Sequence, residues 1–123
     1  MAYARGDVVL VPFPFTDLSA ARVRPAVVVS SEEYNAQTDE LIVAMVTSRP
    51  QSGPADVRLQ DWREAGLIYP SWVRTKLATL ERRLIQFSPG SISDRDAYEL
   101  ETRLTWALGL SHPPIGNADD RHS

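Results

Sequence analysis

The sequence predicts a mainly β domain, in which a small antiparallel sheet curls toward a barrel and one C-terminal helix covers it. Two patterns favour this fold class. The first 90 residues hold five short, mostly β-branched runs separated by turn residues, whereas helical periodicity appears only after residue 91. Length is a third observation, because 123 residues with 43% hydrophobic side chains suffice for one core and not for two.

The first half of the chain is expected to form three strands, at residues 7–13, 25–31 and 40–48. The third is the longest and most apolar, which is typical of a central strand. Proline cannot donate to a ladder, so "PFPF" at 12–15 is expected to leave the sheet as a stiff extended edge. Arg24 precedes a proline and is therefore expected to be extended at the start of the second strand.

The middle of the chain begins with a loop at residues 49–56, which holds two prolines and a glycine. "VRL" at 57–59 predicts a short strand, and residues 60–67 predict a helical turn. Residues 72–80 alternate in polarity, and residues 82–87 continue in extended form after a charged turn. We expect these last two segments to pair as strands.

The C-terminal third predicts one helix, in which Ser93 is the N-cap with Asp96 three residues later and Gly109 ends the helix. Its apolar face is expected to consist of Ala97, Leu100, Leu104, Ala107 and Leu108. The domain is thus expected to span residues 1–110. Residues 111–123 hold few apolar side chains, and we expect them to form a poorly ordered tail.

Charge and composition narrow the class of protein. The chain has no cysteine, no signal-peptide pattern and no apolar run long enough to span a bilayer, so we expect a cytoplasmic protein without a membrane partner. Its net charge of −3 comes from residues 91–123, because residues 1–90 hold ten basic and ten acidic side chains. The basic residues between Arg49 and Arg83 permit a local basic face. Neither a phosphate-binding glycine loop nor a metal-ligand cluster is present, so no cofactor and no metal are expected.

Four segments in this order resemble the MazF/PemK family of toxin–antitoxin ribonucleases: "RGDVVLVPFPF" (5–15), "RPAVVVS" (24–30), "VTS" (46–48) and "DWREAGLIYPSWVRTKLATL" (61–80). The resemblance covers residues 5 to about 110. It implies an SH3-like β-barrel of five to seven strands with a C-terminal helix. It also implies a homodimer that cuts single-stranded RNA and is silenced by a cognate antitoxin.

The resemblance carries two catalytic residues onto this chain. The family's essential arginine, in an Arg-Pro pair at the start of the second strand, corresponds to Arg24, and a threonine at the end of the third strand corresponds to Thr47. These residue types suit attack by the RNA's own 2′-hydroxyl, because a guanidinium matches phosphate oxygens and a hydroxyl can donate to them. Some relatives have Arg-x-Asp where this chain has Arg74-Thr75-Lys76, so the aspartate's role as a base does not carry over.

Other residues are expected to contact the RNA through stacking, charge or hydroxyl groups. They are Phe13, Phe15, Arg22, Ser48, Arg49, Arg74 and Lys76. Two alternatives stay open at this level. One is a toxin of the same fold that binds DNA gyrase without catalysis, and the other is a non-catalytic RNA-binding module. Arg24 and Thr47 would be dispensable in the first.

Overall fold

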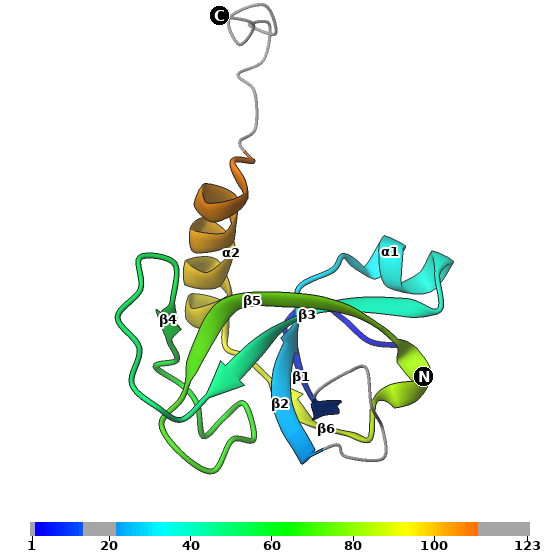
Figure 1. Ribbon diagram of the computed structural model, residues 1–123, viewed down its shortest axis with the longest axis horizontal. Coiled ribbons are helices and arrows are strands. Elements are labelled where there is room, and N and C mark those ends of the chain that lie inside the picture. The colour runs from blue at the N-terminus through cyan, green and yellow to red at the C-terminus, as the bar shows by residue number, and fades with distance from the viewer. Residues whose placement is uncertain (1, 14–21, 111–123) are drawn as a thin grey trace, which may run out of the picture.

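The protein forms one curled, six-stranded antiparallel sheet with two helices, in a computed structural model that describes residues 2–13 and 22–110 (Figure 1). The strand order is β4-β5-β3-β2-β1-β6. The elements are β1 (Asp7–Phe13), β2 (Arg22–Val28), α1 (Glu32–Gln37), β3 (Glu40–Thr47), β4 (Val57–Arg58), β5 (Trp72–Glu81), β6 (Phe87–Ser91) and α2 (Asp94–Leu108). The predicted fold class, a mainly β domain with a C-terminal helix, is confirmed. The predicted tail at 111–123 lies outside the described residues.

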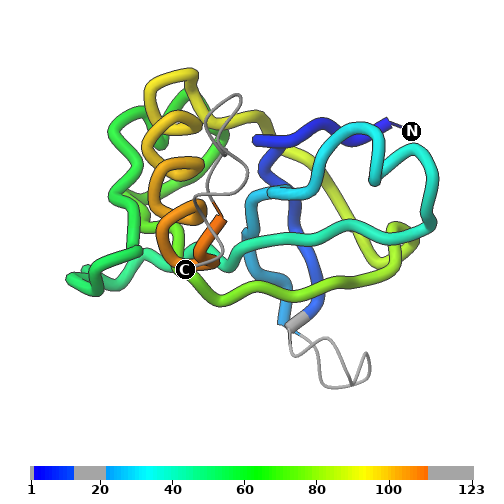
Figure 2. The backbone as a smooth tube through the Cα atoms, turned by 90° about the horizontal axis from the view of Figure 1, so that it is seen from above, coloured from blue at the N-terminus to red at the C-terminus, as the bar shows by residue number. Residues whose placement is uncertain are grey.

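Both faces of the sheet are buried, which explains why its strands read as nearly continuous apolar runs. On one face Val8 and Val27 belong to a cluster that Leu100 and Leu104 of α2 complete. On the other face Val9 and its neighbours form a second cluster with β3 and β5. Figures 1 and 2 agree in placing α2 beside the segment that carries β4, and α1 at the opposite end of the sheet.

The turn after β4 packs against β6, the strand at the far edge of the sheet order. Residues 60–67 form the predicted helical turn, in which Ala65 N–H donates to Asp61 O over 3.2 Å. A Cβ added to Gly66 would lie 2.8 Å from Pro89 O, and one added to Gly90 would lie 2.8 Å from Ala65 O. Glycines therefore let this turn and β6 approach closely, and we call this contact the glycine seam.

The predicted caps of α2 are confirmed. Ser93 Oγ accepts from Asp96 N–H over 3.3 Å, and Gly109 adopts a left-handed φ of 70°. The predicted apolar face was wrong at its end, because Ala107 is exposed and Leu108 is 52% exposed. The last turns of α2 project beyond the sheet, as Figure 1 shows, so nothing in the described residues covers them.

Three further predictions need correction. The second strand begins at Arg22 and ends at Val28, so Pro25 lies inside it, and the chain then turns into α1. A six-residue helix is too short to show periodicity, and α1 was missed for that reason.

β1 continues through Pro12 to Phe13 rather than leaving the sheet at the proline. The ladder between β1 and β6 ends at Leu10. Beyond that residue, the N–H groups of β1 that face away from β2 have no partner strand, so a proline is tolerated there.

Residues 82–87 do not form the continuous extended segment that was predicted. Arg82–Leu84 is a single 3₁₀ turn, and β6 starts only at Phe87. The side chain of Arg82 donates to the backbone carbonyl groups of Asn35 and Thr38 at the end of α1. This long-range contact turns the chain, and local polarity gives no sign of it.

Candidate functional site

A groove of about 490 Å³ opens where the ends of β2 and β3 meet β6 and the loop before β5. We call it the strand-end groove. Its lining comes from five places in the sequence and comprises Leu10, Val23, Arg24, Pro25, Val46, Thr47, Ser48, Arg49, Gly66, Leu67, Ile68, Tyr69, Ser71, Phe87 and Pro89. Four of the predicted site residues, Arg24, Thr47, Ser48 and Arg49, are thus brought together.

Arg24 and Thr47 both line the strand-end groove, beyond the last pair of the β2–β3 ladder. That ladder ends with Ala26 opposite Met45, two residues after Arg24 and two residues before Thr47. Arg24 is exposed and Thr47 is half-buried. Both side chains line this one groove, so both can reach a small group that binds in it.

The turn after β3 orients the hydroxyl of Thr47. Its Oγ1 accepts from the backbone N–H of Arg49 over 3.1 Å, and Arg49 O accepts from the side chain of Gln51 over 3.1 Å. A hydroxyl that accepts one bond still has its own O–H to donate. The polar end of the groove thus offers two guanidinium groups and two hydroxyls, and its lining includes no carboxylate. This end of the groove suits an anion.

The other wall of the groove is apolar and exposed, and the sequence analysis missed it. Ile68, Tyr69 and Phe87 are 79%, 63% and 61% exposed. A cluster of exposed apolar side chains beside a cationic group is typical of a binding surface. One signal was present in the sequence, since "LIYP" sets three apolar residues in a loop between a helical turn and a strand. Apolar residues of the core read the same in a sequence, so this signal alone does not distinguish a groove from the core.

The remaining predicted site residues do not line this groove. Arg74 lies on β5 with its Nε 4.0 Å from Asp56 Oδ1, and Lys76 is exposed further along the same strand. Arg22 opens β2 opposite Phe13. The structure describes only the backbone of Phe13, and Phe15 lies outside the described residues. Roles for these five residues in binding RNA stay predictions.

An anchor joins the apolar wall to α2. Asp61, in the turn that leads to Gly66, accepts from Ser93 Oγ over 2.5 Å and from two nitrogens of Arg95 over 2.7 Å each. The hydrogen bonds from Arg95, and then from Ser93, lower the pKa of Asp61 to about 2. Asp96 is 2% exposed and accepts from the backbone N–H groups of Gln60 and Asp61 over 2.9 Å each.

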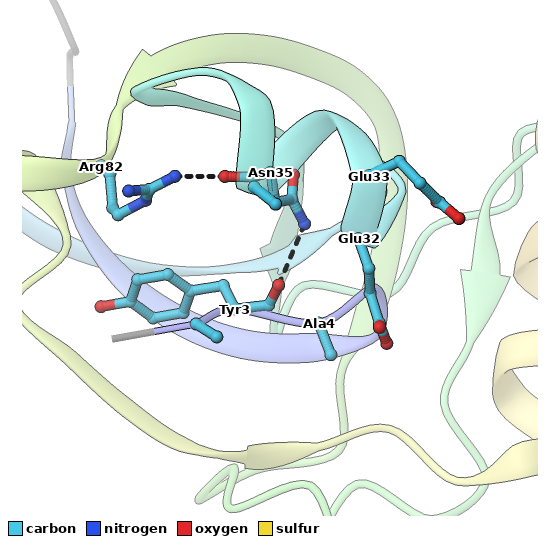
Figure 3. Close-up of a pocket in the computed structure, with 8 residues that line it drawn as sticks. Tyr3, Ala4, Glu32, Glu33, Asn35 and Arg82 are labelled. Atoms are coloured by element: carbon cyan, nitrogen blue, oxygen red, sulfur yellow. Dashed lines mark hydrogen bonds between the residues drawn. The ribbon is translucent and has the colours of Figure 1, made fainter.

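A larger hollow, of about 630 Å³, lies at the opposite end of the sheet between α1 and the N-terminal segment (Figure 3). Two of its polar side chains bond backbone groups. Arg82 donates to Asn35 O, and Asn35 Nδ2 donates to Tyr3 O over 3.1 Å. None of the predicted site residues lines it, so we assign it a structural role.

Two general features complete the description. Within residues 2–13 and 22–110, no three His, Cys, Asp or Glu side chains gather closely enough to hold a metal ion. In the same part of the chain, no helix has both the length and the apolar character needed to cross a membrane.

Comparisons with known proteins bear on the fold and on the family. The family model of the PemK-like, MazF-like toxin of type II toxin–antitoxin systems matches residues 4–108. No curated protein sequence matches. An endoribonuclease with its cognate antitoxin, from a mycobacterial species, has a similar structure, with 21% identity, a TM-score of 0.72 and coverage of 91% of this chain and 98% of that chain. A MazE–MazF complex from Deinococcus radiodurans follows at 22% identity, a TM-score of 0.70 and coverage of 90% and 99%. The Mycobacterium tuberculosis toxin MazF-mt6 has 16% identity, a TM-score of 0.71 and coverage of 86% and 99%.

Proposed function

Since the chain belongs to the PemK-like, MazF-like family of type II toxin–antitoxin toxins, we propose that it is a metal-independent endoribonuclease that cuts single-stranded RNA at short sequences and so arrests growth. The observation that carries the proposal is that Arg24 and Thr47 line one groove whose lining includes no carboxylate. Solved structures of similar fold that are named endoribonucleases give it further support.

The proposed reaction uses the substrate's own 2′-hydroxyl. The 2′-oxygen attacks the adjacent phosphorus, the bond from phosphorus to the 5′-oxygen breaks, and the products are a 2′,3′-cyclic phosphate and a 5′-hydroxyl. Negative charge builds up on the phosphorane oxygens in the transition state. Arg24 offers these oxygens a planar fork of charged donors, and Thr47 adds a neutral O–H donor. Preorganised donors of this kind act where charge develops, and one is typically worth about 3–4 kcal/mol.

Proton transfer falls to water in this proposal. The lining of the strand-end groove contains neither a carboxylate nor an imidazole. An arginine side chain keeps its proton near neutral pH and is a poor general acid. We therefore assign removal of the 2′-proton, and protonation of the leaving 5′-oxygen, to water bound with the substrate.

The proposed partners are a second copy of the chain and a cognate antitoxin. The cationic end of the groove suits an acidic segment that takes the place of RNA phosphates, and the apolar wall suits its hydrophobic side chains. On α2, Trp106 and Leu108 are 64% and 52% exposed, which provides apolar surface for a homodimer. A toxin acting on messenger RNA would work in the cytoplasm.

Incubation with a long RNA tests the proposal against its two alternatives. Cutting in the presence of excess EDTA is expected, with fragments that end in a 2′,3′-cyclic phosphate. A protein that arrests growth, leaves RNA whole and inhibits DNA gyrase would instead be the gyrase-binding toxin. A protein that binds RNA without cutting it would be the RNA-binding module.

A further inference from the structure

A second, smaller recess adjoins the strand-end groove. It has a volume of about 380 Å³ and is lined by Ser48, Tyr69, Pro70 and Trp72. Ser48 and Tyr69 also line the strand-end groove, so the two hollows form one continuous surface. We call the smaller one the aromatic recess. The cutting reaction proposed above uses none of its side chains.

We propose that the aromatic recess binds one nucleobase of the RNA by stacking, beside the phosphate that Arg24 and Thr47 hold, and that it reads the presence of a base rather than its identity. This inference rests on the proposed function. Tyrosine and tryptophan rings are stacking surfaces for single-stranded nucleic acid, because every base has a π face.

Strand pairing places the recess directly beside the reacting group. Trp72 is the partner of Thr47 in the β3–β5 ladder. Opposed residues in such a ladder have Cα atoms about 4.5–5.5 Å apart. A base that stacks in the recess and a phosphate at Thr47 therefore belong to the same nucleotide or to adjacent nucleotides.

The indole ring of Trp72 and the backbone of Tyr69 are held in place before any RNA arrives. The guanidinium carbon of Arg58, the β4 partner of Trp72, lies 5.8 Å from the centre of the indole ring. At this distance a cation is attracted to an aromatic face. Next to Tyr69, Pro70 has a fixed φ, and buried Ser71 donates from Oγ to Tyr69 O over 2.7 Å. A platform that is already ordered loses little entropy when a base binds.

The chemistry of the lining explains why base identity is not read. The polar groups of the recess are the hydroxyls of Ser48 and Tyr69 and the indole N–H of Trp72, a single donor for which each of the four bases has an acceptor. A hydroxyl can rotate to donate or to accept, so it satisfies the edge of any of the four bases. Discrimination between bases needs a fixed pattern of donors and acceptors, such as a carboxylate or an amide supplies. Sequence selectivity must then come from elsewhere on the surface.

The test combines a protein variant with an RNA lesion. Once the cutting site is mapped on a long RNA, a short RNA with that site receives one abasic nucleotide at each position around the scissile phosphate in turn. At one position the abasic RNA should be cut about tenfold more slowly by the wild-type protein, which is a typical cost of losing one stacked base. Swapping the base at that position should change the rate less than about threefold.

The variant Tyr69→Leu keeps an apolar side chain and removes the ring. It should cut intact RNA about tenfold more slowly, and the abasic nucleotide at the same position should then cost it nothing further, as for two changes that remove one contact. Tyr69→Phe keeps the ring and should therefore keep the abasic penalty. Tyr98→Leu is the matched control, because Tyr98 is 73% exposed on α2, outside both hollows, and it should cut intact RNA like wild type and keep the abasic penalty.

Several outcomes would overturn the inference while leaving the ribonuclease in place. In one, the rate penalties of Tyr69→Leu and of the abasic lesion multiply when the two are combined. In another, changing the base at that position alters the rate tenfold. In a third, Tyr69→Leu cuts intact RNA at the wild-type rate. If Tyr69→Leu cuts normally and loses the antitoxin, the recess is a protein contact. If the wild-type protein neither cuts nor binds RNA, the proposed function fails and the inference fails with it.

Discussion

At the scale of single residues, the proposed reaction depends on Arg24 and Thr47, which bring a charged donor and a neutral donor to the strand-end groove. Arg24→Ala should lower the rate of RNA cutting by about 10²–10³-fold, the usual cost of losing a donor to developing negative charge. The thermal midpoint should stay close to that of wild type, since Arg24 is exposed. A gel assay of RNA fragments together with a circular-dichroism melt measures both.

Two further variants serve as references for Arg24→Ala. Thr47→Ala should cost less, about tenfold, because a neutral hydrogen bond is weaker than a charged one. Arg83→Ala should cut normally, since Arg83 pairs with Glu81 over 2.9 Å and lies outside the groove. Full cutting activity in a folded Arg24→Ala protein would remove Arg24 from the proposed mechanism.

Asp61 predicts how the stability of the fold depends on pH. The hydrogen bonds from Arg95 and Ser93 lower its pKa from 3.8 to about 2. A carboxyl with a depressed folded-state pKa stabilises the fold fully above its unfolded pKa, and this stabilisation is lost as the pH falls through the folded value. Asp61→Asn should therefore lower the thermal midpoint at about pH 6, and its difference from wild type should shrink below pH 3.8 and vanish near pH 2.

Glu99→Gln provides the comparison for Asp61→Asn. Glu99 pairs with Arg103 at a spacing of four residues on the exposed surface of α2, where such pairs contribute only about 0.3–0.5 kcal/mol. Its thermal midpoint should stay near that of wild type at about pH 6. A difference for Asp61→Asn that is constant across the acid range would show that the Arg95 contact does not act through the charge of Asp61.

Sequence reasoning reached only part of the site at this scale. Arg24 and Thr47 were assigned because their motifs resemble a family. Their place in one groove could not be predicted from the strands alone, because the start of β2 was misplaced by three residues. Ile68, Tyr69 and Phe87 were missed, because an apolar residue reads the same whether a core or a groove receives it. The place of Trp72 beside Thr47 depends on the pairing of β3 with β5, which lie far apart in the sequence.

The glycine seam is the feature to test at the scale of elements, because it fixes the turn after β4 against β6 and both line the groove. Gly90→Ala brings a Cβ within 2.8 Å of Ala65 O. Overpacking of this kind costs about 1–3 kcal/mol. Gly66→Ala meets Pro89 at 2.8 Å and is also strained by a φ of +83°, so it should lower the free energy of unfolding most and slow RNA cutting as well.

Gly109→Ala separates the two causes of strain. Gly109 has a φ of +70° and no atom within 4 Å of an added Cβ. It should lose only about 1–2 kcal/mol from left-handed backbone strain and should cut RNA like wild type. Urea denaturation of the three variants gives their order. If Gly66→Ala were no worse than Gly109→Ala, the turn and β6 would not be in firm contact.

Elements whose environment is uniform along their length were predictable, and those set by distant contacts were not. β1, β2 and β3 are largely buried on both faces and therefore show as apolar runs. The bounds of β1 were predicted correctly, both ends of β2 were misplaced by three residues, and the end of β3 was misplaced by one. The caps of α2 are local and were found. The 3₁₀ turn at Arg82 depends on carbonyl groups of α1, more than 40 residues earlier, which local sequence does not reveal.

At the scale of the whole molecule, a chain of net charge −3 carries a groove whose lining has two arginines and no carboxylate. The charge of this groove, rather than the net charge of the chain, therefore decides which ligands the groove attracts. We expect a homodimer in light scattering at micromolar concentration, and an acidic antitoxin segment should compete with RNA for the groove. Adding that segment should raise the RNA concentration needed for half-maximal cutting. A monomer at micromolar concentration, or antitoxin binding that leaves RNA cutting unchanged, would contradict this expectation.

The most direct test of the central claim is a single 2′-deoxy substitution at the nucleotide 5′ of the scissile phosphate, assayed in excess EDTA. If the substrate's own 2′-oxygen attacks the phosphate held by Arg24 and Thr47, cutting at that bond should stop. Binding should persist, because the base and phosphate contacts remain. The unmodified RNA should still yield a 2′,3′-cyclic phosphate and a free 5′-hydroxyl. Cutting of the deoxy strand as fast as RNA would make water the nucleophile, and the roles assigned to Arg24 and Thr47 would be wrong.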